Sequence, residues 1–426
     1  MSTLDLINNK IEQLRSSGIQ TKLTPYEEKA IHEFNRFGIP TVRNEEWKYT
    51  RIGSLFNKEF QFSIDRASSA KIDIDAFRLP EHENASELVF INGFFASEKS
   101  KIRSSNIKVV SLEEAASNEY STIVADHLGN SSKYVRDGIY ALNSASIKDG
   151  IFIHITHGPE IEPVHIYNIT DISSGNILSQ LRNLIYVSKR ARLQITETYA
   201  TIGMSESFIN QVTEIIVEQD AIVDYYKIQN DVSSNNQVST AHFRQIGKSE
   251  INVVTISLNG GIIRNNLNIS LEAEYAEAHM YGLYFLKGTT HIDNHTVADH
   301  IKPNCMSNEL YKGIVDDNGT AVFNGKIFVQ PLAQKTNAFQ SNKNILLSDS
   351  AGINTKPQLE IFADDVKCSH GCTVGRLDEE GMFYLQSRGI SEKIARSLLV
   401  HAFAVDILDH IKPIALRNYI DRLISD

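Results

Sequence analysis

Short apolar runs dominate the middle of the chain. From about residue 151, runs rich in Ile, Val, Leu and Tyr follow one another, separated by Gly, Asn and Asp. Their starts recur at roughly 8 to 12 residues for much of this region, which predicts successive β-strands with no long helix between them. This spacing suits a β-sandwich, a barrel or a β-solenoid, and no strict repeat chooses among them. The predicted strands cover 151–155, 184–187, 193–199, 214–217, 222–228, 251–258, 267–271, 278–285 and 321–329.

The N-terminal region has a helical period instead. Pro25, followed closely by two glutamates, predicts a helix with acids near its positive end, and Gly38 stops it. Residues 41–150 are mixed, and the run 87–93 is one clear buried strand. A helix before Pro25 is predicted by apolar residues spaced three and four apart, namely Leu4, Ile7, Ile11 and Leu14.

The C-terminal end is helical again. Asp378 precedes two glutamates and predicts a helix that ends at Gly389, and Ser391 begins the next one. We therefore divide the chain into a helical and mixed region (1–150), a β core (151–375) and a helical domain (376–426). Within this last domain we expect an apolar stripe to form the packed face, made of Ile394, Leu398, His401, Val405 and Leu408.

Composition narrows the class of protein. The chain has 426 residues, enough for a large core, and its hydrophobic (42%) and charged (22%) fractions are typical of globular proteins. Its 42 basic and 52 acidic residues give a net charge of −10, which argues against nonspecific binding to nucleic acid or to an anionic membrane surface. Three cysteines make no disulfide framework. Without a basic signal-peptide start or an apolar run of ~18 residues, we expect a cytoplasmic location and no membrane segment.

Cys368, His370 and Cys372 form the most informative group in the sequence. On an extended strand these alternate positions share one face, which would present two thiols and an imidazole. Such donors bind iron, zinc or copper. Cys372 could join the other two at one ion only if the chain bends, as Gly371 would allow, and three ligands do not suit a closed structural zinc site. Small buried cysteines beside a hydrogen-bonded histidine remain the alternative.

Other polar clusters support weaker hypotheses. His291, Asp293 and His295 would share a strand face, with Asp299, His300 and Cys305 following, so a metal site and a polar strand face both stay open. The acid pairs at 316–317 and 364–365 are typical of turns, because adjacent strand residues point to opposite faces. We predict that Trp47 is a local packing anchor. No nucleotide-binding P-loop is present, so we expect no ATP site in this chain.

A family resemblance covers most of the chain. The segments 367–378 (KCSHGCTVGRLD) and 383–390 (FYLQSRGI) resemble the C-terminal signature of the SufD family of the SUF iron–sulfur cluster assembly system. The sister family SufB carries a glutamate-bearing segment where this chain reads Cys-Ser-His-Gly. Cys372 departs from the SufD pattern, which usually has a small residue such as Ala there. Further segments that resemble the SufD family lie at 38–41, 46–50, 307–313, 323–326, 333–342 and 346–348.

The resemblance implies a fold and a role. It implies a right-handed parallel β-helix core flanked by the two helical regions, in a non-enzymatic scaffold subunit. The partners would be SufB, bound through the β-helix and its terminal strands, and the ATPase SufC, bound through the C-terminal helices. ATP binding by two SufC subunits would expose the buried SufB interface. There His370, assisted by Cys368, would hold iron or a nascent cluster, transiently and shared with SufB. The kinship of SufB and SufD also implies that the isolated chain could pair as a homodimer.

Two functions of other classes remain as alternatives. A carbohydrate-active β-helix enzyme would need a groove of convergent acids, and usually a secretion signal, which this sequence does not display. A stand-alone metalloprotein using Cys368 and His370 would bind metal tightly without a partner, whereas half of a shared site would bind it weakly.

Overall fold

The computed structural model describes residues 20–61, 72–147, 150–158 and 161–425. The helix predicted from Leu4, Ile7, Ile11 and Leu14 lies outside these residues. The other expected helices are present, with α2 starting beside Pro25 and ending at Gly38, whose φ is 61°. The α-helices are α2 (Thr24–Phe37), α4 (Leu112–Ser117), α5 (Ser121–His127), α6 (Gly138–Ser144), α7 (Glu379–Ser387), α8 (Glu392–Leu408) and α9 (Ile414–Ser425).

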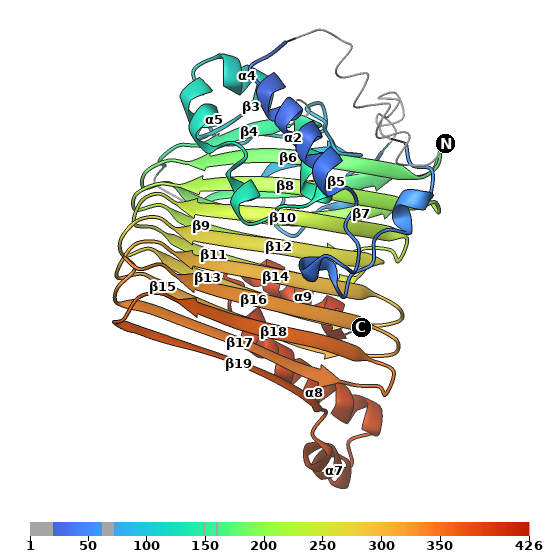
Figure 1. The fold of residues 1–426 in the computed structure, drawn as a ribbon. Helices are drawn as coiled ribbons and strands as arrows, with labels where there is room; N and C mark the ends of the chain where they lie inside the picture. The colour runs from blue at the N-terminus through green and yellow to red at the C-terminus, as the bar shows by residue number, and fades with distance from the viewer. Residues whose placement is uncertain (1–19, 62–71, 148–149, 159–160, 426) are drawn as a thin grey trace.

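Two stacked sheets make up the centre of the molecule (Figure 1). From β5 to β19 the chain alternates between them, so each turn of the solenoid adds one strand to each sheet. The ten-stranded sheet contains β1 (Ser86–Ile91), β2 (Phe94–Phe95), β5 (Glu162–Asp171), β7 (Arg192–Ile202), β9 (Ile222–Asn230), β11 (Glu250–Asn259), β13 (Glu277–Leu286), β15 (Met306–Val315), β17 (Thr336–Leu346) and β19 (Val366–Arg376). The nine-stranded sheet contains β3 (Ile107–Ser111), β4 (Ile151–Ile155), β6 (Ile177–Val187), β8 (Ser207–Val217), β10 (Asn235–Gln245), β12 (Ile262–Leu271), β14 (His291–His300), β16 (Thr320–Val329) and β18 (Gly352–Ile361).

The predicted fold class, mainly β with a solenoid core and helical ends, is confirmed. Side chains such as Ile215, Phe243 and Ile269 stack from turn to turn in a continuous core between the sheets. The predicted spacing of strand starts was wrong, because the core strands are longer than the apolar runs within them. Strands β8, β9 and β10 start at residues 207, 222 and 235.

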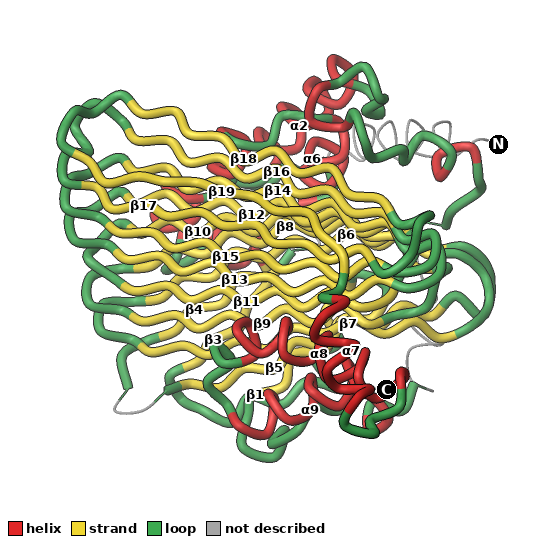
Figure 2. Tube along the Cα trace, turned by 90° about the horizontal axis from the view of Figure 1, so that it is seen from below, coloured by secondary structure: helices red, strands yellow, loops and turns green. Residues whose placement is uncertain are grey.

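Helices cover the outer faces of both sheets (Figure 2). Helix α6 packs on β6 and β8 of the nine-stranded sheet, while α8 packs on β13 and β15 of the ten-stranded sheet. The expected C-terminal stripe is wrong at its start, since Ile394 and Leu398 are 56% and 48% exposed, while its last residue, Leu408, is buried as expected. The helix instead buries Ala395, Ala404 and Ile407, because small alanines let it approach the sheet closely. No helix among the described residues is long and apolar enough to cross a membrane.

Candidate functional site

The two ends of the solenoid differ. At the first end, β2 and β3 pair antiparallel with β1 and β4, and helices α4 and α5 lie beside them (Figure 1). At the last end, β18 pairs with β16 and β19 pairs with β17, and within the described part of the chain neither has a neighbour on its other side. Most residues of β19 are exposed. This end is therefore an open edge that offers unpaired backbone groups and side chains from the interior.

The Cys368, His370 and Cys372 side chains belong to this open end. As predicted from their spacing, the segment is a strand, β19, and the three residues alternate along it. Their partners on β17 are Ala338, Gln340 and Asn342, which are all buried inside the solenoid. The three side chains therefore continue the interior face of the sheet into the last turn, where no further turn covers them.

Exposure separates the three candidate donors. His370 and Cys372 are exposed, whereas Cys368 is half-buried and packs against the interior core. This burial raises the pKa of the Cys368 thiol, so it keeps its proton until a metal displaces it. Within the described residues, no group of three or more His, Cys, Asp or Glu side chains is placed to hold a metal ion. Within the described chain, the row therefore does not bring three such donors to one point.

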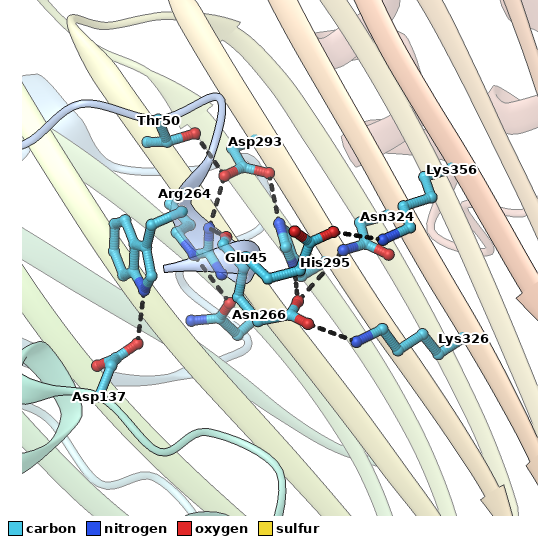
Figure 3. Close-up of polar contacts among 12 residues, drawn as sticks. Glu45, Thr50, Asp137, Arg264, Asn266, Asp293, His295, Asn324, Lys326 and Lys356 are labelled. Atoms are coloured by element: carbon cyan, nitrogen blue, oxygen red, sulfur yellow. Dashed lines mark hydrogen bonds and ion pairs between the residues drawn. The ribbon is translucent and has the colours of Figure 1, made fainter. Parts of the chain in front are cut away.

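The second predicted cluster is occupied by protein contacts (Figure 3). His291, Asp293 and His295 share the outer face of β14, as their spacing predicted, while His300 points inward and its Nε2 lies 2.8 Å from Ser307 Oγ. Residues 41–50, which we call the N-terminal strap, lie across this face. Thr50 donates to Asp293 at 2.5 Å and lies 2.9 Å from His291 Nε2.

A buried ion pair anchors the strap. Arg264 Nη1 of β12 donates to Asp293 Oδ2 at 2.7 Å and to the Glu46 carbonyl at 2.6 Å. Its guanidinium lies 4.0 Å from the centre of the Trp47 ring, and the indole donates to Asp137 at 3.0 Å. Trp47 is 1% exposed, so its predicted role as a packing anchor is confirmed. The polar side chains around His291 therefore form a clamp, which holds the strap against the sheet.

Ion pairs extend the clamp toward the open end. Glu46 pairs with Lys326 of β16 at 2.6 Å, and Glu45 pairs with Lys356 of β18 at 2.8 Å. Hydrogen bonds from His295 and Lys326 overcome the effect of burial and lower the pKa of Glu46 to about 2, so its carboxylate is charged at neutral pH. The strap thus connects the N-terminal region to the last strand of the nine-stranded sheet.

The acid pairs lie outside any site. Asp316 and Asp317 form the turn between β15 and β16, where Asp317 has a φ of 49° and Gly319 N–H donates to the Asp316 carbonyl at 2.9 Å. Asp364 and Asp365 lie in the bend before β19. Both pairs are in turns or bends, as predicted, and neither forms the convergent groove that a glycosidase needs.

The chain is similar to known proteins along most of its length. Residues 170–403 match the family model for the SUF system FeS cluster assembly, SufBD core domain, and residues 2–166 match the SufBD protein N-terminal region. An iron–sulfur cluster assembly SufBD family protein of Synechocystis is 34% identical over 406 residues, which cover 91% of this chain and 87% of that protein. The iron–sulfur cluster assembly protein SufD of Escherichia coli is 29% identical over 411 residues, covering 94% and 92%.

Proposed function

Because the chain belongs to the SufBD family of the SUF iron–sulfur cluster assembly system, we propose that it is a non-catalytic scaffold subunit of that system. It would pair with SufB through the open end of the solenoid and with the ATPase SufC through the C-terminal helices. Iron or a nascent cluster would be held transiently at the SufB interface as cargo. This proposal rests on the row of Cys368, His370 and Cys372 along the uncovered edge strand β19.

The open end has the features of an interface that needs a second solenoid. Strands β18 and β19 each offer one unpaired edge, and a related β-helix could continue both sheets there by strand addition. Such docking would cover the exposed donors and bring donors of the partner beside them. A chain with two suitable ligands would then share a site that it cannot form alone.

His370 and Cys368 are the proposed donors of this chain. Imidazole and thiolate suit iron, and both must be unprotonated to bind it. Cys368 shares the row with His370 and lies on the same face two residues away, so the two can reach one ion. Cys372 lies on the same face but has no assigned part in the proposal.

The C-terminal helices offer a surface for SufC. Phe383 and Tyr384 of α7 are 74% and 58% exposed, and Ile394 and Leu398 of α8, which packs against α7, are exposed too. Apolar side chains exposed together in this way are typical of a protein interface. The described residues of α8 that pack on the ten-stranded sheet are different ones, so the helix can hold its place and bind a partner at once.

The assembly is tested by co-expression with SufB and SufC from the same source, followed by light scattering. We expect a stable complex with one copy of this chain, one SufB and two SufC. Purification of this chain alone, while SufB and SufC still associate, would contradict the partner assignment. Light scattering on the isolated chain at several concentrations measures whether the open end also supports a homodimer.

The donor assignment is tested in the same complex. His370→Ala should lower the cluster yield, measured by visible absorbance and iron content, without changing the thermal melt. Ser369→Ala is the matched control, because Ser369 is the exposed neighbour that points to the other face of β19. A full cluster yield from His370→Ala would refute the assignment.

A further inference from the structure

A ladder of polar side chains leads from the interior of the solenoid to His370. The strand register places Glu309 of β15 beside Gln340 of β17, and Gln340 beside His370 of β19. Adjacent strands are ~4.8 Å apart, so neighbours in one row can bond directly. Glu309 and Gln340 are 4% and 3% exposed, whereas His370 is exposed. The row therefore runs from a buried acid to the candidate ligand.

The amide of Gln340 is held at its nitrogen. Gln340 Nε2 donates to Glu309 Oε2 at 2.7 Å. Gly325 on the facing strand β16 makes room for this amide, because a β-carbon at Gly325 would lie 2.3 Å from Gln340 Nε2. An amide that turns its nitrogen toward β15 turns its oxygen away from it. Gln340 Oε1 is buried and has no hydrogen-bond partner among the described residues.

A buried acceptor without a partner costs free energy, commonly about 1–3 kcal/mol. The next strand on the far side of Gln340 from Glu309 is β19, and the residue in register there is His370. An imidazole has two nitrogens, and when it binds a metal through one it usually donates the N–H of the other to a fixed acceptor. Gln340 Oε1 is an unpartnered acceptor on the neighbouring strand, at the position in register with that imidazole.

We propose that Gln340, oriented by Glu309, positions the imidazole of His370: Gln340 Oε1 accepts one ring N–H and leaves the other nitrogen unprotonated for iron at the open end. The inference rests on the proposed function of His370 and adds two positioning residues to it. Neither Gln340 nor Glu309 touches the iron. Burial raises the pKa of Glu309 to about 7, so its neutral and charged forms are both present near neutral pH. Both forms keep an oxygen that accepts from Gln340, so Glu309 can orient the amide in either state.

The first readout is the protonation of the His370 ring in the metal-free chain. Histidine ring nitrogens labelled with ¹⁵N report, by their chemical shifts, which nitrogen carries the proton, and His370→Ala assigns the signal. We expect one fixed tautomer in the parent and a mixture in Gln340→Met, which keeps the side-chain volume and removes the acceptor. Glu309→Leu should also give a mixture, whereas Glu309→Gln, which still accepts from Gln340, should keep the parent tautomer.

The second readout is the affinity for Co²⁺, a spectroscopic probe for iron, followed by its visible absorbance. We expect Gln340→Met to weaken binding by ~10- to 100-fold, the usual effect of losing such an outer partner. Gln237→Met is the matched control. Gln237 of β10 is 2% exposed, close to the 3% of Gln340, and its amide also has one unpartnered atom, the nitrogen, but it lies several turns away from His370. If Gln340→Met does not fold, Gln340→Asn, whose shorter amide falls short of β19, replaces it.

The outcomes separate this inference from the proposed function. If His370→Ala loses the Co²⁺ signal while Gln340→Met keeps both the parent tautomer and the parent affinity, the positioning role is wrong and the ligand role stands. If His370→Ala gives a full cluster yield in the complex, the proposed function fails, whatever the tautomer. Equal losses in Gln340→Met and Gln237→Met would mean that any buried amide matters, and would also overturn the inference.

Discussion

Asp293→Asn should release the N-terminal strap while leaving the solenoid folded. The substitution keeps the shape of the side chain and removes its charge. Arg264 is then left with its side chain 3% exposed and its ion-pair carboxylate gone. Loss of one member of a buried ion pair costs about 3–5 kcal/mol. We expect the lower end, about 3 kcal/mol, because Arg264 keeps the Glu46 carbonyl and its bond to Asn266 at 3.1 Å.

This cost falls on the docked strap, because Arg264 and Asp293 both lie on the sheet and the strap covers them through Glu46, Trp47 and Thr50. Release of the strap returns the unpaired guanidinium to water. About 3 kcal/mol is roughly a hundredfold in the equilibrium between docked and released strap. The chain has one tryptophan, and it is Trp47 of the strap, so fluorescence reports docking directly. In a urea titration, Asp293→Asn should lower the midpoint of the Trp47 transition, while circular dichroism of the β core keeps the parent midpoint.

The expected pH dependence follows from the pKa of Asp293. Burial alone would raise it, but His295 and Arg264 outweigh burial and hold the pKa of Asp293 well below its usual range. A lowered pKa contributes stability above the unfolded value of about 4, and this is lost only as the pH falls through the folded value. The parent and the variant should therefore differ fully at neutral pH and converge in strong acid.

The matched control is Asp299→Asn. Asp299 lies on the same face of β14 and is equally buried, but its partners are Lys133, Tyr134 and Gln330 rather than strap residues. This variant should leave the Trp47 midpoint unchanged. If Asp293→Asn shifts the Trp47 transition by less than about 0.5 kcal/mol, the ordinary range for surface changes, the clamp does not hold the strap.

Three further predictions concern the core and the C-terminal surface. Gly313→Ala should lower the melting temperature, since its β-carbon would lie 2.1 Å from the Tyr284 ring and overpacking costs about 1–3 kcal/mol; an unchanged melt would show that the ring moves freely. Burial raises the pKa of Glu309 to about 7, so the parent should lose stability as the pH rises from about 4.5 through 7. Glu309→Gln should then melt above the parent at pH 8 and with it at pH 4, and parallel curves would contradict this. Phe383→Asp should weaken SufC binding in a titration while the melt stays unchanged, and equal affinity would exclude this surface.

Local signals predicted the ends of elements well. Asp378 and Ser391 are predicted helix starts, and their side chains accept from the backbone N–H groups of Glu380, Gly381 and Ile394. The alternation of Cys368, His370 and Cys372 was confirmed because a strand repeats every two residues whatever surrounds it. Such features depend on a few neighbouring residues, and a single sequence contains them.

Polar strands were missed because their hydrogen bonds come from other turns. Strand β10 is almost wholly buried although its sequence begins Asn-Asn-Gln. Inside the solenoid, Gln229 Nε2 donates to Gln237 at 2.9 Å and to Asn265 at 3.0 Å, so polar residues fill inward positions that a hydrophobic pattern leaves blank. The same cause hid Gln340 and Glu309. A polar residue at an inward strand position would have been the signal, once the register was known.

The C-terminal stripe failed for a related reason. Ile394 and Leu398 follow a helical period, but a period alone does not say which face meets the sheet. Ala395 and Ala404 occupy that face, and alanines carry little weight in a search for apolar stripes. Ile394 and Leu398 were left on the outside, where a partner rather than the core can cover them.

The strap also determines when the fold can be completed during synthesis. Glu45 leaves the ribosome early, yet its partner Lys356 follows 311 residues later. At ~5–20 residues per second, this gap lasts on the order of 15 to 60 s. Until Arg264 has also been made, Trp47 lacks part of the surface that buries it, so a shorter nascent or truncated chain shows an aromatic side chain that the finished protein hides. Complete closure of the strap thus marks a chain that has been made at least through β18, and a protease or chaperone that meets an open strap meets an unfinished product.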